Sequence, residues 1–181
     1  MDEERIIVRP AISADVVFAD EIIQEMESSA IARGSGISKR SAASVIEKID
    51  TGKAIVAVTE QGEWAGFSYI ECWDDGKFVS NSGLIVSPKH RNQGVASAIK
   101  SQIFELSLRK YPGAMIFSIT SGAAIMKMNI RLGFEPVTYA EIAKESRFWD
   151  GCKSCVNYEI LQGTGRVNCL CTAMLFYPTK N

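Results

Sequence analysis

Three consecutive strand-like segments, separated only by short turns, constrain the fold of this chain most strongly. They are "KAIVAVTE", "EWAGFSYIECW" and "KFVSNSGLIV", at residues 53–60, 63–73 and 77–86. The intervening "QG" and "DDG" are turn sequences of the kind that close antiparallel hairpins. The three segments are therefore expected to pair in sequence order as a meander.

Helical patterns precede and follow this meander. Apolar residues recur at helical spacing behind Ser13, a suitable N-cap, and again after Gly94. The expected elements are a strand at 5–9, helices at 13–26 and 42–49, the meander, a helix at 94–110, a strand at 114–120, a helix at 121–133 and a cysteine-rich hairpin within 150–178. This order indicates an α/β fold.

Length and charge limit the kind of protein. With 181 residues, 46% of them hydrophobic, the chain can bury one substantial core, so a single domain over residues 1–181 is expected. A formal net charge of -1 without long charged runs argues against nucleic acid as a partner. The acidic N-terminus and the lack of a bilayer-length apolar segment predict a cytoplasmic protein without a membrane partner.

The stretch "SPKHRNQGVASAIK" places a polar turn directly before the helix expected at 94–110. The first turn of a helix leaves backbone N–H groups without partners and carries the positive end of the helix dipole, so it can bind a phosphate. Gly94 would let the backbone approach an anion closely, and Ala96 would keep the next turn small. The alternative is a solvated loop before an ordinary helix start.

Within this stretch, "RNQGVA" satisfies the motif Arg/Gln-x-x-Gly-x-Gly/Ala at Arg91, Gly94 and Ala96. The strand end "LIV" and "SP" precede it, and "RLGFEPV" follows one strand and one helix later. In these features the chain resembles the GNAT family of acyl-CoA-dependent N-acetyltransferases. The resemblance implies a mixed, mostly antiparallel central sheet that is flanked by helices on both faces.

The resemblance also implies a site for acetyl-CoA. The strand end from Leu84 to Val86 would separate from the next strand and pair with the pantetheine arm, and Lys89, His90 and Arg91 would add charge near the phosphates. His90, the single histidine, is expected to be a solvated loop residue. The backbone N–H groups that would hold the pyrophosphate are those of Asn92, Gln93, Gly94, Val95 and Ala96.

Acetyl transfer needs a deprotonated amine, donors for the oxyanion and a proton for the departing thiolate. The resemblance places Asn129 where the family often has a tyrosine as the proton donor. Its amide could contact CoA and donate a hydrogen bond to the thiolate, but it has no acidic proton at neutral pH. Its alternative is a polar residue on an exposed helix face. Glu71 is the candidate base if it faces the cleft, and its alternative is a solvent-facing strand residue beside a turn.

Four of the five cysteines form two local pairs, CxxC at Cys152 and Cys155 and CxC at Cys169 and Cys171. Four soft ligands suit a tetrahedral zinc ion, and a hairpin folded about residues 163–165 would bring the pairs together. The spacing is not that of a standard finger or ribbon. Buried thiols and redox or disulfide chemistry are therefore the alternatives.

These features predict an enzyme that moves an acetyl group from acetyl-CoA to the primary amine of a small molecule by direct attack in a ternary complex. The loop at 32–40 and the last hairpin are expected to shape the acceptor pocket. The rival hypotheses are a CoA-binding or metal-responsive regulatory domain and a zinc-stabilised interaction module. The segment "TAMLFY" is a candidate for pairing in a homodimer.

Overall fold

A seven-stranded sheet organises residues 5–178, the part of the chain that the computed structural model describes. The ends of the expected domain, residues 1–4 and 179–181, lie outside these residues. The sheet order is β1-β2-β3-β4-β5-β7-β6, with β4 and β5 parallel and the other neighbours antiparallel. The strands are β1 Ile6–Pro10, β2 Ala54–Thr59, β3 Trp64–Trp73, β4 Phe78–Val86, β5 Met115–Thr120, β6 Glu135–Val137 and β7 Thr172–Phe176. The expected mixed, mostly antiparallel sheet is confirmed.

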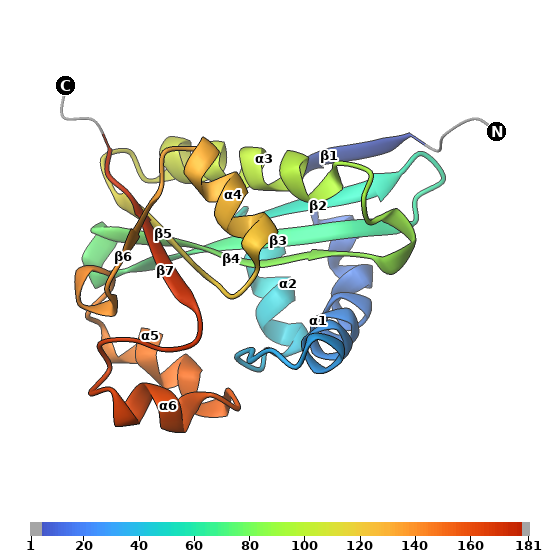
Figure 1. Cartoon of the computed structure of the whole chain (residues 1–181). Coiled ribbons are helices and arrows are strands. Elements are labelled where there is room, and N and C mark those ends of the chain that lie inside the picture. The colour runs from blue at the N-terminus through green and yellow to red at the C-terminus, as the bar shows by residue number, and fades with distance from the viewer. Residues whose placement is uncertain (1–4, 179–181) are drawn as a thin grey trace.

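Helices cover both faces of this sheet (Figure 1). One face carries α1 Ala19–Arg33, α2 Ala42–Asp50 and the short helices α5 Ser146–Asp150 and α6 Tyr158–Gly163, and the other carries α3 Val95–Lys110 and α4 Ala123–Arg131. Short 3-10 turns occupy Ser13–Phe18, Asp74–Gly76, Pro88–His90, Tyr139–Glu141 and Gly151–Ser154. No helix within residues 5–178 is long and apolar enough to cross a membrane.

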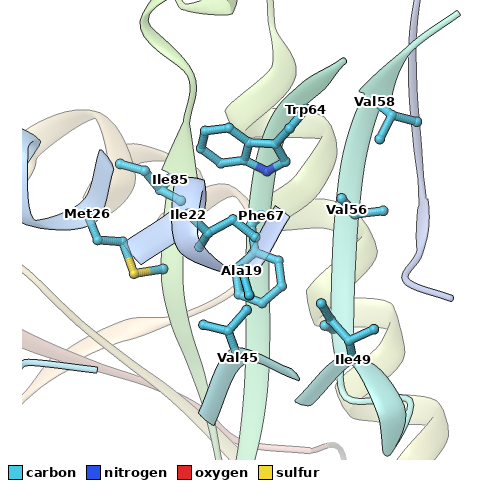
Figure 2. Packing of buried hydrophobic residues seen from close by; sticks show 11 residues of the cluster. Ala19, Ile22, Met26, Val45, Ile49, Val56, Val58, Trp64, Phe67 and Ile85 are labelled. Atoms are coloured by element: carbon cyan, nitrogen blue, oxygen red, sulfur yellow. The ribbon is translucent and has the colours of Figure 1, made fainter. Parts of the chain in front are cut away.

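The alternation of side chains along β2 explains why both faces are covered. All six residues of this strand are buried, with Val56 packed toward α1 and α2 and Ile55 packed toward α3. Successive strand residues point to opposite faces, so a strand that is buried along its whole length needs a helical layer on each side. Figure 2 shows the first of these layers, where side chains of α1 and α2 meet Phe67 and Trp64 of β3.

β4 leaves β5 halfway along its length. The two strands pair only over Phe78–Ser80, opposite residues 115–117, whereas β4 continues beside β3 to Val86. A bulge falls in this second half, because the β3–β4 register places both Gly83 and Leu84 opposite Ser68. Within the described residues, the β4 end therefore has no strand partner on its β5 side.

The C-terminal segment corrects the sequence-based prediction of a hairpin. "NYEILQ", expected as a strand, forms α6, and the one strand within residues 150–178 is β7. Leu161 is buried, while the neighbouring Ile160 is exposed. After α6 the chain returns to Tyr139, whose backbone N–H donates to the Val167 carbonyl oxygen. A short apolar run fits a helix or a strand, and packing on the sheet decided between them.

Candidate active site

The start of α3 presents backbone N–H groups that have no protein acceptor. Gly94 is the N-cap in the left-handed region, with φ of 78°, and Asn92 also has a positive φ of 62°. Within the described residues, the N–H groups of residues 94–97 make no hydrogen bond, and Ala98 is the first to bond back, to Gly94. A Cβ placed on Gly94 would meet no atom within 4 Å. This exposed turn has the charge and the space to bind an anion.

Arg91 is turned away from that anion-binding turn. Its Nη2 donates to Glu25 Oε1 at 2.5 Å and to Ser29 Oγ at 2.8 Å on α1, and its Nε donates to the Val86 carbonyl oxygen at 3.2 Å. The side chain therefore ties the turn to α1 and β4. Glu25 pairs with Arg91 and offsets part of the positive charge that this residue is expected to add near the phosphates.

His90 also differs from the expectation. Its side chain is buried with 6% exposed, and its Nε2 has no hydrogen-bond partner among the described residues. The prediction of a solvated loop histidine is wrong, because the 3-10 turn Pro88–His90 folds the ring inward.

A cavity of about 270 Å³ opens where β4 and β5 separate. Three parts of the chain line it: the loop between α1 and α2, the diverging halves of β4 and β5, and the C-terminal segment that contains the four cysteines. Leu84, expected at the pantetheine arm, is part of the lining. The loop at 32–40, expected to shape an acceptor pocket, contributes residues to this wall.

The charges in the cavity wall have one sign. Arg33 and Arg40 contribute to the lining, and the described lining residues include no aspartate, glutamate or histidine. Hydroxyl groups from β4, β5 and the loops supply most of the other polar groups, and they belong to Ser35, Ser38, Ser80, Ser82, Ser118, Thr120 and Ser121. The cavity is thus positive and rich in hydroxyl groups.

Ser80 lies at the point where β4 and β5 separate, and its hydroxyl oxygen accepts two hydrogen bonds. Its Oγ accepts from Trp73 Nε1 at 2.9 Å and from Ser82 Oγ at 3.1 Å. A hydroxyl oxygen that accepts two hydrogen bonds still has its own proton to donate. Ser80 can therefore offer that proton to a group in the cavity.

Arg40 is anchored by neutral oxygen atoms. Its Nε donates to the Tyr69 hydroxyl at 2.6 Å, and its Nη1 donates to the Ser38 carbonyl oxygen at 2.9 Å. Tyr69 stands on β3 beside the β4 bulge, where a Cβ on Gly83 would lie 2.6 Å from Tyr69 Cε1. The bulge thus requires glycine, and the contact fixes the ring that holds Arg40.

The four clustered cysteines line the cavity as thiols. Burial raises the pKa of Cys152 and of Cys171 to about 11, and the neighbouring cysteines add to both shifts. Tyr139 lies in the same wall with its hydroxyl donating to the Cys171 carbonyl oxygen at 2.7 Å, and burial raises its pKa as well. At neutral pH Cys152, Cys171 and Tyr139 are therefore protonated and uncharged.

The tetrahedral zinc site expected at Cys152, Cys155, Cys169 and Cys171 is not formed. Within residues 5–178, no group of three or more histidine, cysteine, aspartate or glutamate side chains is arranged to hold a metal ion. Cys152 lies in a 3-10 turn, Cys155 directly follows that turn, and α6 separates both from the CxC pair. The prediction relied on a hairpin that the chain does not make, so the thiols line the cavity instead.

Glu71 belongs to an ion-pair cluster and is not part of the cavity lining. Its carboxylate accepts a hydrogen bond from Lys48 Nζ and lies 3.5 Å from Lys53 Nζ. Burial alone would raise the pKa of Glu71, but the hydrogen bond and charge of Lys48 outweigh it and hold the pKa below its usual range. The condition for Glu71 as the base, that it faces the cleft, is therefore not met.

Asn129 is buried in α4, so the alternative of an exposed helix face is wrong. The residue is 0% exposed, its Nδ2 lies 3.5 Å from Met174 Sδ, and its Oδ1 has no hydrogen-bond partner among the described residues. A buried carbonyl oxygen without a partner is unusual in a folded protein. The oxygen is fully enclosed in this structure and does not belong to the cavity wall.

Sequence reasoning did not single out Arg40, Tyr69 or the cavity role of the cysteines. Arg40 lies in a loop whose importance was expected, but its partner Tyr69 is 29 positions away. No local spacing indicates such a pair. The signal available was that this loop, residues 32–40, contains three cationic side chains and no acidic one.

No protein-family model and no curated protein sequence matches the chain. Solved structures do match in fold. N-acetylglutamate synthase from Neisseria gonorrhoeae, in complex with coenzyme A and N-acetyl-glutamate, superposes with a TM-score of 0.67 at 15% identity. The match covers 99% of this chain but 36% of that protein.

Two shorter enzymes match over most of both chains. A GNAT superfamily phosphinothricin acetyltransferase from Sinorhizobium meliloti, with acetyl-CoA bound, has a TM-score of 0.62 at 16% identity, over 96% of this chain and 88% of its own. Diaminobutyrate acetyltransferase from Paenibacillus lautus, with L-2,4-diaminobutyric acid and coenzyme A, has a TM-score of 0.60 at 13% identity, over 99% and 98%. The chain has the fold of the GNAT acetyltransferases.

Proposed function

We propose that the protein is an acetyl-CoA-dependent N-acetyltransferase that acts on the primary amine of a small molecule. The observation that carries this proposal is the α3 start, where unpaired N–H groups and an open left-handed glycine directly follow the strand that leaves its neighbour. An anion site and an open strand edge, placed in succession, match the two ends of a long phosphorylated thioester.

The residues present fit acetyl-CoA as a substrate. The N–H groups of residues 94–97 would hold the pyrophosphate, and the backbone of Leu84 to Val86 would bond the pantetheine arm. Asn129 Oδ1, which lacks a partner among the described residues, would accept an N–H group of the same arm after the side chains that enclose it move aside. Acetyl-CoA supplies an activated acyl group, so the chain needs to position it and to stabilise the charge that develops.

The cavity favours an acceptor that is already deprotonated. Its described lining contains no carboxylate or imidazole, and the raised pKa values of Cys152, Cys171 and Tyr139 make these groups neutral and poor at moving protons. The amine would lose its proton to water, and the Ser80 hydroxyl would donate to the oxygen that becomes negative as the amine attacks.

The ligands of the structural neighbours support acetyl-CoA as the acyl donor and a small molecule as the acceptor. The Neisseria protein was crystallised with coenzyme A and an N-acetylated amino acid, and the Paenibacillus protein with a diamino acid and coenzyme A. These ligands are small, and the cavity of about 270 Å³ suits a small acceptor better than a protein chain.

Calorimetric titration with acetyl-CoA tests the cofactor site. The wild type is expected to bind in the micromolar range, and Gly94→Glu to lose binding because its carboxylate occupies the anion-binding turn. Gly113→Glu is the matched control, since Gly113 also has a positive φ, of 84°, and open space around it. Retained binding by Gly94→Glu, or an equal loss in Gly113→Glu, would contradict the proposed site.

A CoA-binding domain without catalysis is the second candidate function. The lack of a carboxylate or imidazole in the described cavity lining favours it. Release of free CoA from acetyl-CoA in the presence of a panel of primary amines separates the two. Amine-dependent release supports the enzyme, whereas tight acetyl-CoA binding without release with any amine supports the binding domain.

A further inference from the structure

Arg40 has donor capacity that the protein does not use. A guanidinium group carries five N–H donors in a planar fork. Two of them are used, by the Tyr69 hydroxyl and the Ser38 carbonyl oxygen, which leaves three without an acceptor among the described residues. These remaining donors belong to a side chain that lines the cavity.

A comparison with Arg9 shows that Arg40 lacks the carboxylate partner that a half-buried arginine can have. Among the described residues, Arg9 and Arg40 are the arginines that are not classed as exposed. Arg9 is matched by Asp15, with Nη1 and Nη2 at 2.8 and 3.0 Å from its two carboxylate oxygens. Arg40 is also half-buried but has no carboxylate partner among the described residues, so its hydrogen bonds go to neutral oxygen atoms.

Arg40 lies close to the strand end at which the acetyl group of acetyl-CoA is proposed to bind. Tyr69 holds its Nε, and the Tyr69 ring packs against Gly83 in the bulge of β4. β4 is the strand whose free end is assigned to the acyl donor. A group bound by Arg40 would therefore lie in the same small cavity as the acetyl group.

We propose that the acceptor is a small amino-carboxylate of the amino acid class, and that Arg40 binds its carboxylate. This inference rests on the proposed function, because it names the substrate class of the same site. A carboxylate has two oxygens in the geometry of the guanidinium fork, and the pair forms charge-assisted hydrogen bonds. The described cavity lining provides no acidic side chain that would repel or replace it.

The remainder of the wall fits such an acceptor. Arg33, at the end of α1, adds a second positive charge at the exposed side of the cavity, and the hydroxyl groups can bond the polar atoms near the amine. The cavity has no acidic group among its described residues to attract a purely cationic polyamine. The wall thus favours molecules that carry both an amine and an anion.

Kinetic comparison of matched acceptors tests this inference. The assay measures kcat/KM with L-amino acids and with the corresponding amino acid amides, which keep the amine and lose the negative charge. The wild type is expected to prefer at least one acid over its amide by about 10- to 100-fold, the range for loss of a charged hydrogen-bonded pair. Arg40→Gln should remove that preference through a higher KM for the acid, and Arg40→Lys should keep part of it.

Lys39→Gln is the control, because it removes the same charge from the neighbouring position. The Lys39 side chain is exposed and is not part of the cavity wall. Equal use of acids and amides by the wild type, or a preference that survives Arg40→Gln, would overturn the inference while the acetyltransferase activity stands.

If acetyl-CoA binds and no amine is acetylated, the proposed function fails and calorimetry decides the inference separately. Binding of L-amino acids to the CoA complex that Arg40→Gln loses and Lys39→Gln keeps would support a carboxylate site. Absence of binding, or equal binding by both variants, would overturn it.

Discussion

Lys100 is the most deeply buried cationic side chain on α3, with 2% of its surface exposed. Its Nζ donates to Asn81 Oδ1 at 3.1 Å and lies 4.8 Å from the centroid of the Phe134 ring, while Ser107 Oγ accepts from the other side of the Asn81 amide. No carboxylate pairs with it among the described residues. Burial lowers its pKa from 10.5 to about 7.

This lysine makes stability depend on pH. Between pH 7 and 10.5 the unfolded chain holds a proton on Lys100 that the folded chain has released, so the free energy of unfolding rises as the pH rises. Below pH 7 both states are protonated and the full penalty of the buried charge remains. We expect Lys100→Met to lack this gain, about 2–4 kcal/mol in total between pH 7 and 10.

The measurement is urea unfolding of both proteins at several pH values, because a difference between variants cancels the titration of all other groups. The free energy of the wild type minus that of Lys100→Met should increase from pH 7 to pH 10. A constant or decreasing difference would show that Lys100 stays charged in the folded state.

Among the elements, the β4 bulge has the most specific requirement. Gly83 has φ of 65°, and a Cβ there would also lie 3.0 Å from Met26 Cε, in addition to its clash with the Tyr69 ring. Gly83→Ala should therefore cost about 1–3 kcal/mol from backbone conformation and more from the displaced ring. The displacement should also weaken the hold of Tyr69 on Arg40.

Gly62→Ala is the control for this prediction, because Gly62 has φ of 87° and no atom within 4 Å of a Cβ. It carries the backbone strain without the clash. Urea unfolding should show a clearly larger loss of stability for Gly83→Ala than for Gly62→Ala. Equal losses would mean that Tyr69 and Met26 move aside freely and that the bulge does not depend on them.

At the scale of the whole molecule, the cavity is a joint product of distant segments. The loop after α1, the open ends of β4 and β5, and the cysteine-containing segment meet there, and Gly36 approaches Cys155 so closely that a Cβ would lie 2.4 Å from its Sγ. Occupation of the cavity by an acceptor should therefore be detectable at the thiols.

We expect the alkylation of Cys152 and Cys171 by iodoacetamide to be slow at neutral pH and to speed up about tenfold per pH unit, because their pKa values are about 11 and the thiolate is the nucleophile. Acceptor should protect both residues. Peptide mapping by mass spectrometry measures each site, with Cys72, which is not in the described lining, as the unprotected control.

A different outcome would revise the account of these thiols. Protection that persists without acceptor and is lifted by a metal chelator would demonstrate a bound metal ion. That result would contradict the present arrangement, in which the four residues are free thiols that line the cavity.

Particular elements show where sequence reasoning succeeds. The meander and α3 follow from apolar spacing and turn residues, which act over a few positions, and the structure confirms both. The same reasoning failed for α6, because six residues are too few for the helical and strand periods to differ clearly. It also failed for His90 and for the alternative of an exposed Asn129, because burial depends on what packs over a residue.

The sequence by itself determined the order of the main elements as far as α4, the three-stranded meander and the open turn at Gly94, because each depends on local periodicity or on the backbone freedom of one residue. Only the tertiary structure decided that Lys48 and Lys53 bind Glu71, that Tyr69 holds Arg40 and that the cysteines line a cavity. These pairings join residues far apart in the chain. Their free energy exists only after the sheet has brought the segments together.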